Sequence, residues 1–146
     1  MLVCSYEPIV TQDDAYHELC AYTLAHARDD ARFIHQHVVD AFAAQHATAE
    51  SKPIAVFFSV IGLYLHVERG LTGRQVQQVH VQLAQQKLAW PRLELPEHRG
   101  SITSIGVLAA PAGPERDRAI EAWCKSVWSA FSENRAIIAE FSRQHT

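Results

Sequence analysis

Three histidines, an aspartate and two glutamines lie within residues 33–46, which read FIHQHVVDAFAAQH. Imidazole and carboxylate side chains can ligate a metal ion, and they can also act as general bases and acids. The spacing of the apolar residues predicts that this stretch is a helix. Ligand-capable side chains on the buried side of a helix indicate either a site or a set of satisfied core hydrogen bonds.

His35 and His46 share one face of this helix with Val39 and Phe42, as a helical wheel shows. Along the helix axis the two histidines lie roughly 16 Å apart. A zinc ion holds its imidazole ligands at about 2.0–2.1 Å, so the two side chains cannot share one ion on a continuous helix. Each histidine therefore needs further ligands from other helices.

Asp40 lies on the opposite face, three residues after His37 and four after Gln36. A carboxylate next to a histidine can orient its imidazole for metal binding or for general-base catalysis. Pairs at this spacing are more often surface pairs that contribute a few tenths of a kcal/mol, roughly, to helix stability. We expect a surface pair here.

Two interpretations stay open for His35, Gln45 and His46. They can be core or helix-end side chains, because residues in the last helical turn hydrogen-bond to free carbonyl groups and a histidine there interacts well with the helix dipole. They can instead line a ligand-binding site.

Glu68 is the carboxylate nearest to the apolar residues 53–65. A buried glutamate must find a cationic partner or be protonated, and Arg69 or a histidine from residues 33–46 can supply the charge. A site for a divalent metal such as zinc would combine Glu68 with His35 or His46. The motifs Glu-x-x-His, His-x-x-x-His and His-Glu-x-x-His are absent from the sequence, so no cofactor is established.

The uncharged residues 53–65, PIAVFFSVIGLYL, predict a helix that is buried on all sides. They fall short of the roughly 20 apolar residues that span a bilayer. A buried strand is the alternative, because the segment is rich in β-branched and aromatic residues.

The helices expected around this segment begin at Thr11, at Asp29 or Asp30, at Thr72 and at Pro114. Thr72 and Gln75 have the spacing of a capping box, and Gly70 suits the end of the helix before it. The segment after Ser101 is either a short helix or extended, and Ser132 is a point at which the last helix can break.

The sequence thus predicts an all-α fold, a single domain over residues 1–146 with five or six helices packed around the apolar one. Residues 1–10 are expected to form an N-terminal arm. Residues 89–101 contain two prolines and are expected to form a long loop, held against the bundle by Trp90, Leu93 and Leu95.

Composition narrows the class of protein. The chain has 146 residues with 48% hydrophobic and 20% charged residues, which is typical of a globular protein. A net charge of −3 and the lack of a long basic run argue against nucleic-acid binding. The three cysteines, Cys4, Cys20 and Cys124, form no Cys-x-x-Cys motif, which excludes a zinc ribbon. The N-terminal residues do not resemble a secretory signal, so we expect a cytoplasmic protein without membrane contact.

Four segments, in order, resemble a widespread bacterial family known only as a domain of unknown function: HQHVVDAFAAQH, LYLHVERG, PEHRGSIT and AWCKSVWSAF. The family pattern is H-x-L-T-V-D-A-Y-A-x-Q-H-P, then L-E-R-G, then R-G-x-L-T, then W-x-x-x-V-W. The match extends from about Tyr16 to Phe141. It falls on His35, Asp40, Ala41, Gln45, His46, Glu68, Arg69, Gly70, Arg99, Gly100, Thr103, Trp123, Val127 and Trp128.

The chain departs from that pattern in two places. Many members begin with a pair of cysteines suggestive of zinc, whereas this chain has Cys4 there, and the proline expected after His46 is absent. The resemblance implies a shared fold and highlights residues, but it implies no reaction.

We therefore expect a module that binds a small molecule or a partner protein, and that forms a homodimer. The candidate ligand-binding residues are His35, Asp40, Gln45, His46, Glu68, Arg69 and Arg99. The alternative is a small, hydrolase-like, metal-dependent enzyme that uses His35, His46 and Glu68. A third hypothesis makes the last helix a contact face for a partner, in which case Trp128 and Phe131 should be exposed.

Overall fold

The computed structural model describes residues 10–25 and 34–146, and the regular structure in these residues is helical throughout, which confirms the all-α prediction. The helices are α1 (Gln12–Ala25), α2 (His35–Gln45), α3 (Pro53–Val67), α4 (Gly73–Ala84), α5 (Ser104–Ala109), α6 (Pro114–Ala130) and α7 (Arg135–His145), with a 3-10 turn at Ser132–Asn134. The described residues thus form seven α-helices. Five or six helices were expected. The segment after Ser101 forms the short helix α5, and the last expected helix is divided at Ser132 into α6 and α7.

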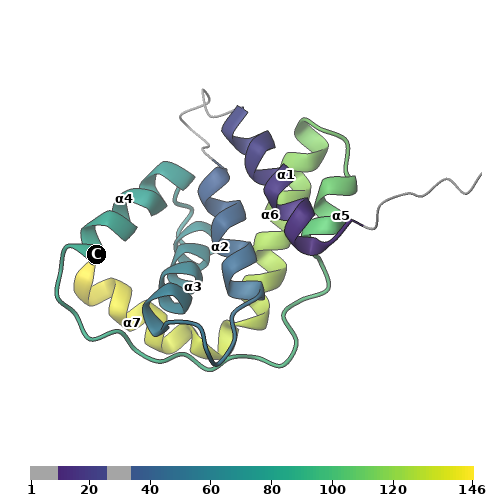
Figure 1. Ribbon diagram of the computed structural model, residues 1–146. Helices are drawn as coiled ribbons and strands as arrows, with labels where there is room; N and C mark the ends of the chain where they lie inside the picture. Colours follow the sequence, from purple (N-terminus) through teal and green to yellow (C-terminus); the bar gives the residue numbers. More distant parts are fainter. Residues whose placement is uncertain (1–9, 26–33) are drawn as a thin grey trace, which may run out of the picture.

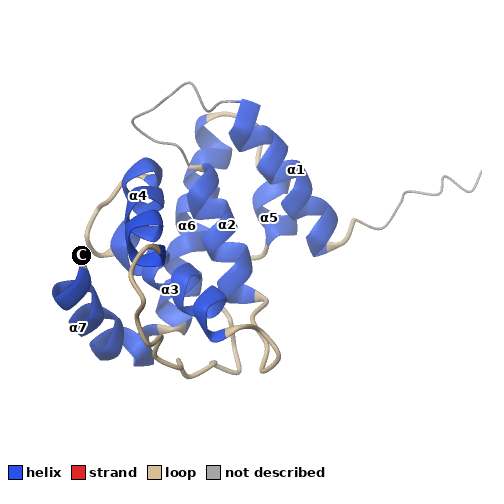
Figure 2. Cartoon of the chain, turned by 60° about the vertical axis from the view of Figure 1, so that its left-hand side comes forward, coloured by secondary structure: helices blue, strands red, loops and turns tan. Residues whose placement is uncertain are grey.

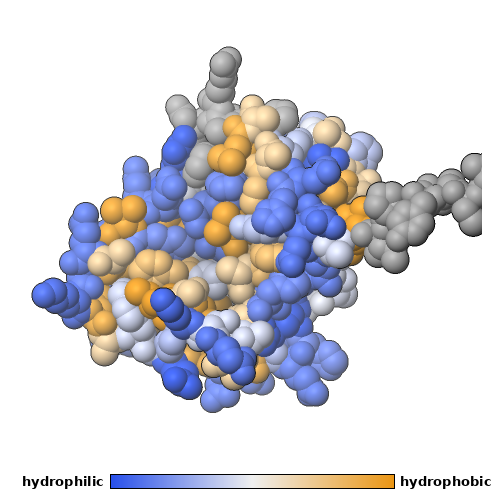
Figure 3. Space-filling model, in the orientation of Figure 1, coloured by the Kyte–Doolittle hydropathy of each residue, from blue (hydrophilic) through white to orange (hydrophobic). Residues whose placement is uncertain are grey.

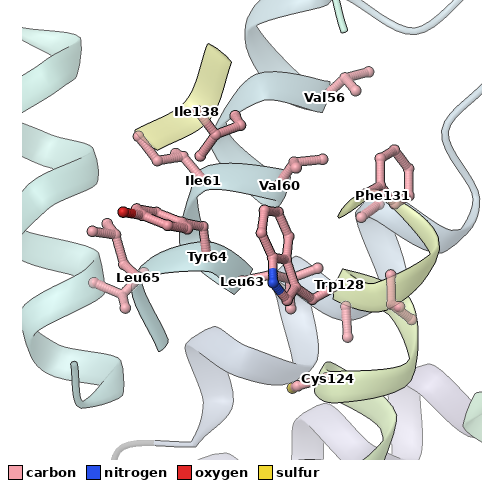
Figure 4. Close-up of a cluster of buried hydrophobic side chains, with 14 of the residues drawn as sticks. Val56, Val60, Ile61, Leu63, Tyr64, Leu65, Cys124, Trp128, Phe131 and Ile138 are labelled. Carbon is pink, nitrogen blue, oxygen red and sulfur yellow. The ribbon is translucent and has the colours of Figure 1, made fainter. Parts of the chain in front are cut away.

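Helix α3 lies at the centre, as predicted, and the strand alternative is wrong. Every side chain from Ser59 to Leu65 is buried. Helix α3 contacts α2, α4, α6 and α7, and α1 and α5 pack beyond α2 and α6 (Figure 1). In the core, Val60, Ile61 and Tyr64 of α3 face Trp128 of α6 and Ile138 of α7 (Figure 4).

The helix ends follow the local sequence. Thr72 and Gln75 form the predicted capping box, since Gln75 N donates to Thr72 Oγ1 at 3.2 Å and Thr72 N donates to Gln75 Oε1 at 2.9 Å. Gly70, just after α3, has a φ of +70°, the left-handed conformation that glycine adopts without strain. Helix α2 begins at His35, with Ile34 before it, which is later than the start expected at Asp29 or Asp30. Asp29 and Asp30 themselves lie in residues 26–33, outside the described residues.

The loop that precedes α5 runs along one end of the helices, as Figures 1 and 2 show. Leu93 is buried in it, and the rings of Trp90 and Phe57 lie 5.9 Å apart. The buried Asn134 accepts a hydrogen bond from Glu94 N at 2.8 Å and donates one to Glu94 O at 2.9 Å. The loop is therefore held against the helices, as predicted, and the 3-10 turn before α7 supplies one of its anchors.

Hydrophilic residues cover most of the face seen in Figure 3, with hydrophobic residues between them in small groups. Within the described residues, no helix is long and apolar enough to cross a membrane. Trp128 and Phe131 are buried, which counts against the last helix as a contact face. The single domain and the homodimer stay predictions.

Candidate functional site

Helix α2 turns a different face to the core than the helical wheel predicts. Its buried polar side chains are His37, Asp40 and Gln45, whereas His46 is exposed and His35 is half-buried. The expected surface pair of His37 and Asp40 is therefore wrong. The physical reason is that α1, α3, α4 and α6 all contact α2, so several of its sides are covered at once.

His35 contacts α1, and His46 contacts a side chain of α2. His35 Nδ1 lies 2.9 Å from Thr23 Oγ1 of α1, and burial lowers the pKa of His35. The ring of His46 packs on Phe42 with centroids 4.2 Å apart, and the partial desolvation of the imidazole lowers the pKa of His46 as well.

Glu68 forms its ion pair with Arg135 of α7, not with Arg69 or a histidine of α2. Arg135 Nε donates to both carboxylate oxygens, at 2.8 and 2.9 Å. Arg69 is exposed in the turn that follows α3. In the part of the chain that the structure describes, no group of three or more His, Cys, Asp or Glu side chains could hold a metal ion. The candidate set of His35, His46 and Glu68 is thus not assembled there.

Gln45 links the end of α2 to α6 and to the long loop. Its Oε1 accepts a hydrogen bond from the buried Trp123 Nε1 at 3.0 Å, and its Nε2 donates to Ile102 O at 2.7 Å and Arg99 O at 3.2 Å. Of the two interpretations left open for Gln45, these contacts support the helix-end hydrogen bonds.

Arg99 also links the long loop to the end of α2. Its Nη1 donates to the carbonyls of Ala44 and Ala47, at 3.1 and 2.9 Å, just where α2 has unsatisfied acceptors. Arg99 and Gln45 therefore tie the loop to the end of α2, and neither lines the pocket described below.

We expect Gln45→Met to lower the free energy of unfolding by about 2–4 kcal/mol, because it leaves the Trp123 N–H buried without a partner. Urea unfolding followed by circular dichroism measures the change. Gln78→Met, on an exposed position of α4, is the matched control and should shift stability by less than about 0.5 kcal/mol. Equal stability of the two variants would contradict the bridging role of Gln45.

Asp40 is a buried acid with one oxygen satisfied. Oδ1 accepts a hydrogen bond from Gln36 Nε2 at 3.0 Å, the predicted pair, whereas Oδ2 has no partner among the described residues. Burial raises the pKa of the Asp40 carboxyl well above its usual value, and the hydrogen bond from Gln36 opposes that shift only in part. The buried Asp40 carboxyl packs against Gly62 of α3.

A pocket of about 420 Å³ lies between the turn after α3 and the first half of α6. The rings of His37 and His66 form part of its lining, and they stack with centroids 3.5 Å apart and an angle of 20° between their planes. Leu71, Thr72 and Glu121 line it further.

His66 is held between two acceptors. Its Nδ1 lies 3.1 Å from Leu71 O and its Nε2 lies 2.6 Å from Glu121 Oε2. A carbonyl and an ionised carboxylate only accept, so both nitrogens carry hydrogen and the ring is an imidazolium. Burial lowers the pKa of His66, but the bonds to Glu121 and Leu71 outweigh it and raise the pKa overall. The same bond to His66 lowers the pKa of Glu121.

His37, by contrast, is neutral. Burial and the charge of His66 lower its pKa to about 3, against an opposing contribution from Glu121. The residue is 2% exposed, and no described group hydrogen-bonds to its ring nitrogens. The site therefore places a neutral imidazole beside an imidazolium–carboxylate pair.

The sequence argument did not single out Glu121. A signal was present, because Asp117, Glu121, Cys124 and Trp128 follow each other at intervals of four, three and four residues and so share one helix face. A carboxylate in the same stripe as two core residues indicates an inward-facing charge. Its partner His66 could not be found in this way, since the pair joins helices that are distant in the sequence.

The family model of DUF5946, described as a family of unknown function, matches residues 13–132, and this confirms the resemblance noted from the sequence. Every residue that lines the pocket lies within the matched range. No curated protein and no solved structure matches the chain.

Proposed function

The chain belongs to DUF5946, a family of unknown function, and we propose that it is a small-molecule-binding module whose site is the pocket between α3 and α6. The observation that carries the proposal is the His37 ring, which is buried, lines the pocket and lacks a hydrogen-bond partner among the described residues. Its ring nitrogens are not among the fully buried atoms that lack a partner, so they open onto the pocket. A ligand in the pocket would supply the missing partner.

The size and composition of the pocket suit this role. Its volume of about 420 Å³ falls in the range of roughly 300–1,000 Å³ that is usual for small-molecule sites. The apolar side chain of Leu71 and the hydroxyl of Thr72 line it together with the charged pair.

The protonation states favour binding over acid–base catalysis. Both nitrogens of His66 are occupied by Leu71 and Glu121, so this ring offers no lone pair to a substrate. A pKa of about 3 makes His37 a weak base at neutral pH, whereas an effective general base has a pKa near the working pH. The metal-dependent hydrolase has less support, because Glu68 is engaged by Arg135.

Ligand-observed NMR with a panel of small polar metabolites tests the proposal. The pocket is blocked by Arg118→Trp at its rim, and the matched control is Arg143→Trp on an exposed position of α7. We expect compounds that bind the unmodified protein to lose their saturation-transfer signal with Arg118→Trp and to keep it with Arg143→Trp. Circular dichroism confirms that both variants are folded.

Two results would overturn the proposal. One is a panel in which no compound binds with a dissociation constant below about 1 mM, corresponding to roughly −4 kcal/mol. The other is binding that persists unchanged in the blocked variant, which would place the ligand elsewhere.

A further inference from the structure

Two oppositely charged side chains face the pocket without pairing with each other. Arg118 and Glu121 lie three residues apart on α6, a spacing at which an arginine and a glutamate commonly meet. Here Glu121 turns its Oε2 to His66 instead, at 2.6 Å. Arg118 is left with no ion pair or hydrogen bond to any described residue.

The carboxylate is also only half engaged. Within the described part of the chain no group hydrogen-bonds to Glu121 Oε1, and the side chain is 44% exposed. The pocket therefore offers a ligand one acceptor oxygen on an ionised carboxylate and, from the next turn of the same helix, a guanidinium group. The neutral ring of His37 lines the same pocket, and no described residue hydrogen-bonds to its nitrogens.

We propose that the ligand is a small zwitterion with a primary ammonium and a carboxylate group, of the class of free α-amino acids. Its ammonium group binds Glu121 Oε1, and its carboxylate binds the guanidinium of Arg118, which can donate two parallel hydrogen bonds. This inference rests on the proposed function, because it names the ligand class of that same pocket.

The balance of charge favours a zwitterion over an ion of one sign. His66 and Arg118 bring two positive charges to the pocket, and Asp117 and Glu121 bring two negative ones. Tyr22 already donates to Asp117 Oδ1 at 2.8 Å, as His66 does to Glu121. A ligand with one net charge would engage Glu121 or Arg118 but not both, whereas a zwitterion engages both. Thr72 Oγ1 accepts from Gln75 N, so its own hydroxyl proton is left for the ligand.

The first experiment measures binding of each of the twenty common L-amino acids by isothermal titration calorimetry and saturation-transfer NMR. The best binder is compared with the amine that lacks its carboxylate and with the acid that lacks its amino group. We expect the amino acid to bind at least about tenfold more tightly than either counterpart, because each one loses a charge-assisted contact. If other panel compounds bind but no amino acid does, the zwitterion inference is wrong and the proposed function stands. If nothing binds, both fail.

Two variants then assign the contacts. Arg118→Gln should weaken binding of the amino acid at least about tenfold. Binding of the amine counterpart should not change, since the amine has no carboxylate to contact Arg118. Glu121→Gln should weaken binding of the amino acid and of the amine, but it should not weaken binding of the acid counterpart. Arg143→Gln, far along the chain on α7, is the control and should change none of the three. A similar loss for all three ligands in Arg118→Gln would overturn the assignment, and because Arg118 is exposed this variant should fold normally.

Discussion

Gly62→Ala should lower the free energy of unfolding by at least about 2 kcal/mol, the cost typical of overpacking a core. An alanine inside a helix is normally better than a glycine by about 1 kcal/mol, so the sign is opposite to the one that helix propensity predicts. The cause is Asp40. A Cβ atom on Gly62 would overlap the Asp40 carboxyl, lying 2.7 Å from its Cγ, and would come within 3.1 Å of His80 Nε2. The Asp40 side chain is short and buried, so it cannot move aside into solvent.

Urea unfolding of the matched variant Gly106→Ala supplies the control. Gly106 is also helical, in α5, but no atom lies within 4 Å of its added Cβ, so this change should be neutral or stabilising. The rescue is the double variant Asp40→Ala with Gly62→Ala, in which the new methyl group occupies space that the carboxyl has left. We expect the double variant to be at least about 2 kcal/mol more stable than the summed effects of Asp40→Ala and Gly62→Ala, a coupling energy typical of residues in contact. Additive effects would show that the two residues do not touch.

His37 should make the protein less stable in mild acid. In the unfolded chain a histidine binds its proton near pH 6.5, whereas in the folded protein the pKa of His37 is about 3. Below pH 6.5 the unfolded state therefore binds more protons than the folded state, and stability falls as the pH falls, until the folded pKa is reached. The slope is about 1.4 kcal/mol per pH unit for one such group. Between pH 6.5 and pH 5 His37 accordingly removes about 2 kcal/mol.

Unfolding of the native chain and of His37→Leu at pH 8, 6.5, 5.5 and 5 isolates this contribution. Between pH 6.5 and pH 5 the free energy of unfolding of the variant should rise by about 2 kcal/mol relative to that of the native chain, whatever its value at pH 8. His98→Leu removes a histidine from an exposed position and is the matched control. A parallel pH dependence of His37→Leu and the native chain would contradict a neutral, buried His37, as would a His37 NMR signal that titrates near pH 6.5.

The pair of His66 and Glu121 acts on stability in a defined pH window. The raised pKa of His66 means that its contribution is complete below pH 6.5 and is lost as the pH rises through the folded pKa. The lowered pKa of Glu121 means that its contribution is complete above its usual pKa near 4.3 and is lost as the pH falls. The pair therefore stabilises most between these limits, and only modestly, because the Glu121 side chain is 44% exposed.

Local features of the fold could be predicted because short stretches of sequence decide them. The uncharged residues 53–65 predict the buried α3, and the capping box of Thr72 and Gln75 defines the start of α4. The left-handed conformation of Gly70 could be predicted for the same reason, because it depends only on the backbone of that residue. Each of these predictions depends on neighbours within about one helical turn.

The site could be predicted only in part. Residues 33–46 were singled out for their polar side chains, and the pocket does contain one of them, but it is His37 and not His35 or His46. A helical wheel ranks the faces of α2 by hydrophobicity and assigns the core to the face of Val39 and Phe42. In the structure α1 covers that side, with Tyr16 stacked on Phe42 at 4.0 Å. The face that carries His37 and Asp40 meets α3, α4 and α6.

The sequence by itself thus determined the buried, central α3, the capping box at the start of α4 and the membership of a family. The tertiary structure alone decided which polar groups meet. His66 and Glu121 are 55 residues apart in the chain, and Asp40 faces Gly62 because α2 and α3 pack closely there. Hydrogen bonds and pKa shifts depend on distances of a few ångströms between side chains of different helices. Such distances are set by how the helices pack against each other, and the periodicity of a single helix carries no information about that packing.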